Sequence, residues 1–341
     1  MSKNELGQFY TTNYKYILSN MYIPDNVKNI IEPFAGKGHL LDFINKENYS
    51  IELYDIDPKY KNTIKKDSLK NPPVYKNKFV LTNPPYLARN KNKNKELYDS
   101  YHTNDLYKCF IINLINDICL GGIIIIPLNF ISSIRKSDIN LRKKFIDKYS
   151  INIINIFEEQ VFEDTTYSVC SLYFTQRKSH NNLTKINIYP NIKTFNIELN
   201  SDNNYTIGGE VYNLPHNNKY KIYRATKKNK ENITNILLKC IDDNENNQLG
   251  FKVVEKEKIF IDNTPKLSAR SYATLCINKD ISLEKQEVLV IKMNNYIKNL
   301  REKYFSLFLT NYRESNTIAR KRISFDLAFN ICNYILTNEL E

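Results

Sequence analysis

The sequence is poor in glycine and has no tryptophan. Only eight glycines occur in 341 residues, well below the usual fraction of about 7%. Asparagine, lysine, isoleucine and tyrosine, which AT-rich codons encode, are abundant instead. In a chain that avoids glycine, Gly36 and Gly38 in one turn and the pair Gly121-Gly122 indicate positions where the backbone leaves no room for a Cβ atom.

Several other features are absent, and each absence excludes a class of protein or site. No apolar run is long enough for a transmembrane helix, and the N-terminal segment "MSKNELGQFYTT" lacks the apolar centre of a signal peptide. We therefore expect a cytoplasmic protein without a membrane partner. The six cysteines form no CxxC pair and no zinc-ligand spacing with histidine, so we expect buried, reduced thiols and no metal. No GK[ST] triplet follows a glycine-rich turn, which excludes a P-loop.

The charge balance is strongly basic. The net charge is +12 and the sequence pI is about 9.1, which fits a polyanionic partner such as nucleic acid. The positive charge is spread over both halves of the chain, and the codon bias toward lysine contributes to it. Charge alone therefore supports a nucleic-acid partner only weakly.

Short apolar segments alternate with amphipathic ones over the first 180 residues. The apolar segments predict strands at 27–34, 49–57, 77–85, 121–131, 151–159 and 167–176. The segments between them predict helices at 35–47, 103–120 and 141–149. Strands separated by helices predict an α/β fold with a mostly parallel, doubly wound sheet. Ligands of such sheets bind at the carboxyl ends of the strands.

The pattern changes after about residue 180. Asparagine-rich loops and short strands follow, and the segments 286–310 and 324–336 predict helices near the C-terminus. The sequence thus predicts two domains, 1–180 and a smaller, less regular α+β domain over 181–341.

Polar and glycine-rich motifs lie where two of the predicted strands end. The turn Glu32–Gly38 contains a GxG that lets a ligand approach the backbone, although the GxGxxG of dinucleotide sites is incomplete. Asp55 ends the next strand, where an acid accepts hydrogen bonds from ribose hydroxyls. Asp67, further along, is a candidate acceptor for an adenine amino group. An ordinary solvated acidic turn is the alternative for these acids.

The tetrapeptide Asn83–Tyr86 (NPPY) follows the third predicted strand. The amide oxygen of Asn83 and the carbonyl of Pro84 offer two acceptors for an exocyclic amino group, whose two N–H groups they would bind. Such bonds raise the electron density on a nitrogen that is otherwise a poor nucleophile, and Tyr86 is placed to stack on the base. The nearby "NPPV" of residues 71–74 has neither a strand before it nor an aromatic after it, and it predicts only a loop.

In this order, "GQFYTT", "EPFAGKG", "DIDP", "KDS" and "LTNPPY" resemble the motifs of the S-adenosylmethionine-dependent N6-adenine DNA methyltransferases. The cofactor motifs precede NPPY and a long segment follows, which resembles the gamma arrangement with its C-terminal target-recognition domain. The resemblance covers residues 1–180. It implies a Rossmann-like methyltransferase domain, S-adenosyl-L-methionine as the cofactor and a flipped-out adenine in double-stranded DNA as the substrate. It also implies a restriction-modification role beside a separate cognate endonuclease.

The resemblance further implies roles for individual residues. The implied catalytic residues are Asn83, Pro84, Pro85, Tyr86 and Phe162, where Phe162 is a second stacking aromatic or, with equal weight, a core residue. The implied cofactor-binding residues are Gln8, Phe9, Tyr10, Thr11, Thr12, Glu32, Pro33, Phe34, Ala35, Gly36, Gly38, Asp55, Ile56, Asp67, Ser68 and Asn83. Some relatives have a large apolar side chain at the position of Ser68, so one side of the cofactor adenine is left without a predicted wall.

Candidate DNA contacts come from basic residues in both predicted domains. They are Arg89, Lys91, Arg224, Lys227, Lys228, Arg270, Arg313, Arg320, Lys321 and Arg322. A solvated surface charge is the alternative for each of them. The basic segment 87–96 after NPPY shows no turn chemistry, and we expect it to be a mobile loop that becomes ordered over DNA.

Other functions are also compatible with these motifs. NPPY also occurs in methyltransferases that modify adenine N6 or guanine N2 of ribosomal RNA and in those that modify a glutamine of release factors. A nucleic-acid-binding subunit without activity is a further possibility, although the complete NPPY and GxG motifs argue against it.

Overall fold

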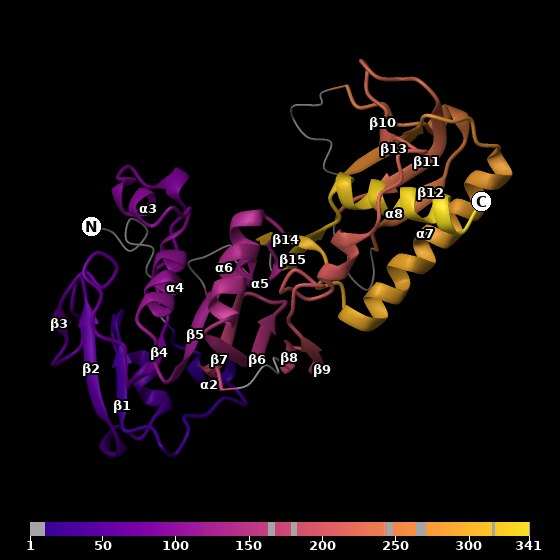
Figure 1. Cartoon of the computed structure of the whole chain (residues 1–341). Helices are drawn as coiled ribbons and strands as arrows, with labels where there is room; N and C mark the ends of the chain where they lie inside the picture. The colour runs from indigo at the N-terminus through magenta and orange to yellow at the C-terminus, as the bar shows by residue number, and fades with distance from the viewer. Residues whose placement is uncertain are drawn as a thin grey trace. The chain divides into compact units, whose positions relative to one another are not determined.

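The structure, a computed structural model, describes residues 11–162, 168–178, 183–241, 243, 248–263, 271–315 and 318–340, with the backbone alone for 311–315 and 318–320. The chain forms two compact units. The first runs to Ile131 and from Arg135 to Leu199, with Glu314–Ala319. The second comprises Ser132–Ile134, Asn200–Arg313 and the chain from Arg320 onward. Figure 1 shows the elements of each unit.

The first unit contains a nine-stranded sheet of order β3-β2-β1-β4-β5-β7-β6-β8-β9. Its strands are β1 (Asn29–Glu32), β2 (Ser50–Asp55), β3 (Ile64–Lys65), β4 (Phe79–Thr82), β5 (Gly121–Pro127), β6 (Tyr149–Phe157), β7 (Val169–Gln176), β8 (Leu183–Tyr189) and β9 (Lys193–Glu198). The strands from β3 to β5 are parallel to their neighbours, as β6 is to β8, whereas β7 and β9 are antiparallel. The predicted mostly parallel α/β sheet is therefore confirmed.

The central strand β5 is buried along its whole length. Its isoleucines 123–126 are fully buried, as expected for a strand covered on both faces. A Cβ atom on Gly122 would lie 2.6 Å from the Val80 carbonyl oxygen of β4. The glycine pair therefore allows the close approach of neighbouring strands that the sequence indicated.

Helices cover both faces of the sheet. Side chains alternate along a strand, and on β7 Phe174 packs on Phe145 of α6 (Lys136–Ile146), with ring centroids 5.1 Å apart. Ser171 points to the other face, where its hydroxyl donates to the Ile17 carbonyl of α2 (Tyr14–Ile17) over 2.6 Å. On the first face, α6 packs beside α4 (Leu106–Asn116), as Figure 1 shows. The sheet is thus doubly wound.

The helix predicted at 35–47 does not form as an α-helix. Two short 3-10 helices, η1 (His39–Phe43) and η2 (Lys46–Asn48), take its place. The chain is extended at Ile44, and the Asn45 side chain accepts a hydrogen bond from the backbone N–H of Glu47. Asparagine thereby competes with helix continuation by capping a new turn.

The sheet also continues beyond residue 180, where the sequence placed the domain boundary. Strand β8 pairs in parallel with β6, and β9 pairs with β8. The first compact unit therefore ends at Leu199. The change in sequence pattern near 180 marks the return of the chain into the same sheet.

The second unit combines an antiparallel sheet with two long helices, as expected for an α+β fold. The sheet has the order β10-β13-β11-β12, and helix α7 packs on β11 and β12 and against α8. Its elements are η4 (Gly209–Asn213), β10 (Ile222–Arg224), β11 (Ile233–Lys239), β12 (Gly250–Val253), η5 (Lys256–Lys258), β13 (Tyr272–Ile277), α7 (Leu283–Tyr304) and α8 (Phe325–Asn338). Strands β14 (Thr310–Ser315) and β15 (Ile318–Arg322) form a separate two-stranded sheet.

All six cysteines are buried and none forms a disulfide, as the sequence predicted. Within the part of the chain that the structure describes, no helix is long and apolar enough to cross a membrane. Over the same residues, no group of three or more His, Cys, Asp or Glu side chains is arranged to hold a metal ion.

A buried ion pair joins the two helices on one face of the sheet. Lys108 Nζ of α4 lies 2.6 Å from Asp138 Oδ1 of α6, and both side chains are 7% exposed. We expect Lys108→Met to lower the free energy of unfolding by about 3–5 kcal/mol, because it removes the lysine ammonium that pairs with a buried carboxylate. Urea denaturation measures this. The exposed pair Lys46–Asp42 supplies the control, and Lys46→Met should cost less than about 1 kcal/mol. Equal costs for the two variants would contradict the account.

Candidate active site at the carboxyl ends of the strands

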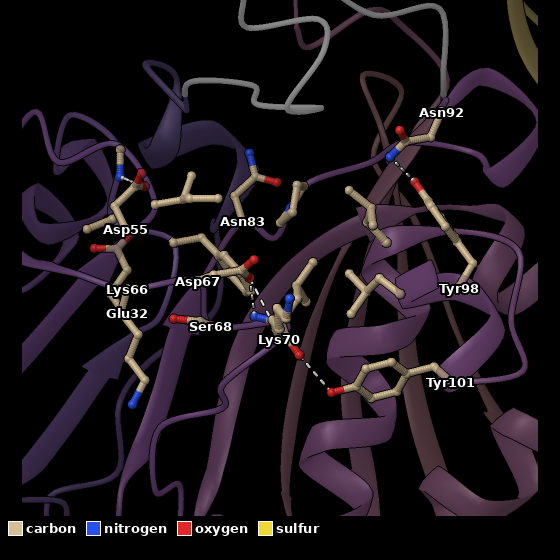
Figure 2. A pocket seen from close by; sticks show the side chains of 18 of the residues that line it. Glu32, Asp55, Lys66, Asp67, Ser68, Lys70, Asn83, Asn92, Tyr98 and Tyr101 are labelled. Atoms are coloured by element: carbon tan, nitrogen blue, oxygen red, sulfur yellow. Dashed lines mark hydrogen bonds between the residues drawn. The ribbon is translucent and has the colours of Figure 1, made fainter. Parts of the chain in front are cut away.

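A cavity of about 590 Å³ lies at the carboxyl ends of β1, β2 and β4. Because neighbouring parallel strands end at the same edge of a sheet, residues far apart in the sequence meet there (Figure 2). The predicted site residues that line the cavity are Thr11, Glu32, Phe34, Ala35, Gly36, Asp55, Ile56, Asp67, Ser68, Asn83 and Pro85. The structure thus brings together most of the predicted cofactor site.

Asp55 connects the turns that follow β1 and β2. Its Oδ2 accepts a hydrogen bond from the backbone N–H of Gly36 over 2.8 Å, and its Oδ1 accepts one from the N–H of Asp57 over 2.8 Å. Each carboxylate oxygen has a second lone pair. Asp55 therefore orders the glycine turn, and its carboxylate belongs to the lining of the cavity.

Glu32 is a buried carboxyl group in the same cavity, with 1% of its surface exposed. Its Oε2 has no hydrogen-bond partner among the described residues. Burial, and secondarily the nearby charge of Asp55, raises the pKa of Glu32 well above its ordinary value. A buried acid without a partner is suited to a cationic group of a ligand, which would stabilise its ionised form.

The next part of the cavity wall combines an exposed apolar side chain with a hydrogen-bonded acid. Ile56 is 40% exposed and lines the cavity, so it offers an apolar surface. Asp67 Oδ1 accepts hydrogen bonds from the backbone N–H groups of Leu69 and Lys70 over 3.1 and 3.0 Å. Ser68 is buried beside it.

The carboxamide of Asn83 is held on both sides. Its Nδ2 donates to the Thr11 hydroxyl oxygen over 3.0 Å, and its Oδ1 accepts a hydrogen bond from the Tyr86 hydroxyl. The same hydroxyl lies 2.6 Å from the Ile125 carbonyl oxygen of β5. Asn83 therefore faces the cavity in an orientation that two side chains support.

The two predicted stacking aromatics do not line this cavity. Tyr86 is 2% exposed and its ring packs edge-on against Tyr107, with centroids 6.4 Å apart. Stacking of Tyr86 on a base would therefore require the ring to leave its present position. Phe162 is buried with 5% exposed, which is the environment of the core alternative. Pro84 is also buried and does not line the cavity.

The remaining predicted cofactor residues lie at the margin of the site. Gly38 adopts a left-handed backbone conformation with φ of 75°, and a Cβ atom there would lie 2.4 Å from the Tyr60 ring. Packing against Tyr60 therefore requires a glycine at position 38, whereas Gly36 lines the cavity. Pro33 is buried and Thr12 is exposed, and neither lines the cavity. Gln8, Phe9 and Tyr10 lie outside the described residues.

The segment after NPPY forms one wall of the cavity and differs from the mobile loop that the sequence predicted. It contains η3 (Arg89–Lys91) and α3 (Glu96–Ser100). The side chains of Asn92 and Asn94 accept hydrogen bonds from the backbone N–H groups two residues ahead. These are Asx turns. Asn92 and Asn94 were therefore a turn signal in a segment for which the sequence analysis predicted no turns.

Tyrosine hydroxyls connect parts of this wall to one another and to the loop after β3. The Tyr98 hydroxyl donates to the Leu87 carbonyl over 3.0 Å, and the Tyr101 hydroxyl donates to the Leu69 carbonyl over 2.7 Å. Figure 2 shows both tyrosines on the side of the cavity away from Asp55. Lys37, within the predicted GxG turn, also lines the cavity. Cavity residues that the sequence did not indicate are His39, Leu40, Lys66, Leu69, Lys70, Asn92, Asn94, Glu96, Leu97, Tyr98, Ser100, Tyr101 and Leu106.

Four of the candidate DNA contacts have structural partners. Arg89 is paired with Asp99 over 2.8 Å, and Arg224 with Asp262 over 2.9 Å. Arg224 and Arg322 both lie over the Phe325 ring, with 5.1 and 5.5 Å to its centroid. The fourth, Lys321, is buried, and its Nζ lies 3.5 Å from the Phe305 carbonyl oxygen.

Three other candidates are exposed, namely Lys91, Lys227 and Lys228. Arg270 lies outside the described residues, and the side chains of Arg313 and Arg320 are not described. The exposed lysines are therefore the described candidates best placed to reach a polyanion.

A comparison with protein-family models gives no match, and a comparison with curated protein sequences gives none either. Among similar solved structures is the methyltransferase subunit of a type I restriction-modification system from Streptococcus thermophilus. It is 14% identical, with a TM-score of 0.34, and the match covers 53% of this chain and 47% of that one. The M protein of the type I restriction enzyme EcoKI is 15% identical over 81% of this chain and 67% of that one, with a TM-score of 0.36.

A nuclease-deletion mutant of the type ISP enzyme LlaGI, in complex with a DNA substrate mimic, is also similar. It is 14% identical over 67% of this chain and 32% of that one, with a TM-score of 0.41. This chain spans about half the length of several of the subunits that it matches. At these TM-scores and identities, the likeness carries no inference about the function of this chain.

The raised pKa of Glu32 predicts a pH-dependent stability. The folded protein keeps the Glu32 proton to a higher pH than the unfolded chain, so this group lowers stability as pH rises above about 4.3, the ordinary glutamate pKa. Glu32→Gln does not titrate at this position. We expect it to unfold at higher urea than the wild type at about pH 7 and at similar urea below about pH 4.3. The exposed Glu47→Gln is the control. An equal difference between Glu32→Gln and wild type at both pH values would contradict the assignment.

Proposed function

We propose that the protein is a DNA methyltransferase that transfers a methyl group from S-adenosyl-L-methionine to N6 of an adenine in duplex DNA. One observation supports this most directly. The Asn83 carboxamide, at the start of an NPPY motif, lines the same cavity as the acids Asp55 and Asp67. A candidate acceptor for the target amino group, Asn83, thus lines one cavity with candidate acceptors for a nucleoside, Asp55 and Asp67.

The cavity residues fit the cofactor chemically. Asp55 would bind the ribose hydroxyls, Ile56 would contact one face of the adenine, and Asp67 would accept from its amino group. Glu32 is a buried carboxyl whose Oε2 has no partner among the residues that the structure describes, and it would bind the cationic amino group of the methionine part. Leu97 and Leu106 line the wall after NPPY and would supply the apolar surface that Ser68 does not. The bound cofactor would supply an electrophilic methyl group on its sulfonium.

The reaction requires no strong base from the protein. The Asn83 amide oxygen and the Pro84 carbonyl would accept the two N–H groups of the target amino group. These two hydrogen bonds would draw the amino group toward tetrahedral geometry and raise the electron density on its nitrogen. The nitrogen lone pair would then point in line at the methyl group. The proton that nitrogen loses afterwards passes to solvent.

The target nitrogen lies inside the duplex, so the adenine has to leave the stack. This costs a few kcal/mol, which protein contacts to the extruded base and to the backbone must offset. The second unit, with the exposed Lys227 and Lys228 in the turn after β10, would contact DNA phosphates. A restriction-modification role beside a separate endonuclease is part of the same proposal.

The competing substrates are an amino group of RNA and a glutamine amide of a protein, because two carbonyl acceptors suit any planar amine or amide. Incubation with labelled cofactor and equal amounts of duplex DNA, ribosomal RNA and release factor would separate these cases. We expect the label in DNA. Digestion of that DNA to nucleosides should yield labelled N6-methyl-2′-deoxyadenosine. Label confined to RNA or protein would overturn the proposed substrate, and no label in any of them would favour an inactive binding subunit.

The role of Asn83 has a matched control inside the chain. Asn83→Ala is expected to abolish methyl transfer while cofactor binding stays close to wild type, because the acceptor for the target amino group is lost. Asn71→Ala changes the asparagine of "NPPV", which lies in an exposed loop, and should leave transfer unchanged. Transfer assays and calorimetric cofactor titration measure both variants. Near-normal transfer by Asn83→Ala would contradict the mechanism.

The turn after β10 predicts a salt-dependent DNA affinity. Replacing both Lys227 and Lys228 by alanine should weaken DNA binding about equally across sequences and lower the slope of log affinity against log salt by about 2. Fluorescence anisotropy at several salt concentrations measures the slope. The control is Lys258→Ala, which removes an exposed lysine that pairs with Glu255. An unchanged slope in the double variant would exclude this turn from the DNA contact.

A further inference from the structure

A line of polar side chains crosses four neighbouring strands of the nine-stranded sheet. Its members pair with one another in the strand register and are Ser171 of β7, Asn155 of β6, Asn187 of β8 and Thr194 of β9. Paired positions of neighbouring strands place their side chains on the same face of a sheet. Ser171 and Asn155 are fully buried, and Asn187 is 2% exposed. Buried amides and hydroxyls are costly unless they are hydrogen-bonded, so the partners of this polar line indicate its role.

The polar line ends in hydrogen-bond donors that face the N-terminal part of the chain. Asn155 Nδ2 donates to the Ser19 carbonyl over 2.8 Å and to the Ile17 carbonyl over 3.3 Å. Both backbone oxygens can only accept, so they determine which end of the Asn155 carboxamide is the nitrogen. Asn155 Oδ1 then accepts from Asn187 Nδ2 over 2.9 Å, and Asn187 Oδ1 accepts from the Thr194 hydroxyl over 3.1 Å. The orientation of each amide along the line therefore follows from its partners.

Two further side chains of the sheet hold the same part of the chain. The Ser171 hydroxyl donates to the Ile17 carbonyl over 2.6 Å. The Tyr189 hydroxyl of β8 lies 2.8 Å from Ser19 Oγ and 3.0 Å from Asn20 Nδ2. The N-terminal part of the chain is thus bonded to β6, β7 and β8. Of these strands, β8 belongs to the part of the sheet that follows the change in sequence pattern near residue 180.

One helical turn joins this anchor to the cavity. The turn is α2, where the Ile17 N–H donates to the Asn13 carbonyl over 3.1 Å. Two residues before Asn13, Thr11 lines the cavity and is 3% exposed. The Thr11 hydroxyl oxygen lies 3.0 Å from Asn83 Nδ2. A shift of the anchored end would therefore move a residue of the cavity wall.

We propose that Asn155 is a positioning residue for the cavity, because through the polar line it docks the segment 11–20 on the sheet with Thr11 in the cavity wall. A leucine at position 155 would fill a similar space, but it would deprive the Ser19 carbonyl of this donor. A fully hydrogen-bonded buried network specifies one arrangement of the groups that it joins. The inference goes beyond the proposed methyl transfer and rests on it only for the ligand that serves as the probe.

The test replaces both amides of the polar line, so that neither asparagine faces an apolar partner. In Asn155→Leu/Asn187→Leu, we expect amide hydrogen exchange over residues 11–20 to be about 10-fold faster than in the wild type, because two hydrogen bonds to this segment are lost. The Kd for S-adenosylhomocysteine should also rise about 10-fold. Exchange in β5 should stay within about twofold of the wild type, since replacing both partners of a buried hydrogen bond by apolar groups is nearly neutral. Mass spectrometry and calorimetric titration measure these quantities.

Asn152→Leu is the matched control on the same strand. Asn152 Oδ1 accepts a hydrogen bond from the Thr175 hydroxyl of β7 over 3.1 Å, so this variant removes a cross-strand bond of β6 away from the anchor. Both quantities should keep their wild-type values. Ser171→Ala removes a single hydroxyl and decides the question if the double variant does not fold. We expect exchange over residues 11–20 to be about threefold faster in it.

The outcomes separate this inference from the proposed function. Wild-type exchange over residues 11–20 in the double variant, or in Ser171→Ala if only that variant folds, would overturn the proposal. Faster exchange with an unchanged Kd, or an equal increase in β5, would overturn it as well. If the wild-type protein does not bind S-adenosylhomocysteine, the proposed cofactor is wrong. The exchange comparison alone then decides whether the polar line holds the segment that carries Thr11.

Discussion

The carboxylate of Asp55 is the interaction on which the site depends most. Its two oxygens accept hydrogen bonds from Gly36 and Asp57, so one side chain orders the turns after both β1 and β2. The parallel pairing of these strands brings the turns together, and β4 on the other side of β1 adds Asn83. A ligand that spans this edge therefore meets residues from three strands without a long loop between them.

The same edge of the sheet combines a buried carboxyl group with an exposed apolar side chain. Glu32 is buried, and no residue that the structure describes bonds to its Oε2, whereas Ile56 offers an exposed apolar side chain. Neither is favourable in the absence of a ligand, since a buried acid loses its hydration and an exposed isoleucine keeps apolar surface in water. An elongated ligand with a cationic end and a planar apolar end would offset both costs. This is the physical basis for the proposal that the cavity binds a nucleoside cofactor.

The strand pattern of the first unit was predictable because its signals are local. The isoleucines of β5 and the polar residues that follow β1, β2 and β4 identify strands and the edge where they end. The wall after NPPY was not predicted. Its local turns at Asn92 and Asn94 were readable in the sequence, but contacts such as Arg89–Asp99 and Tyr101–Leu69 depend on the fold. The role expected of Tyr86 likewise rested on the motif, whereas its burial depends on packing against Tyr107 and β5. The segment 35–47 does not form the single helix that its apolar periodicity predicted. The Asn45 side chain accepts a hydrogen bond from the Glu47 backbone N–H and starts a new turn there.

The central claim is that this cavity binds S-adenosyl-L-methionine with its reactive methyl group beside Asn83. A crystal structure with the product S-adenosylhomocysteine tests it most directly. We expect the ribose hydroxyls on Asp55, the adenine against Ile56, the amino group of the homocysteine part on Glu32, and the sulfur facing Asn83. Binding of the product at another place on the protein, or no binding at saturating concentration, would contradict it.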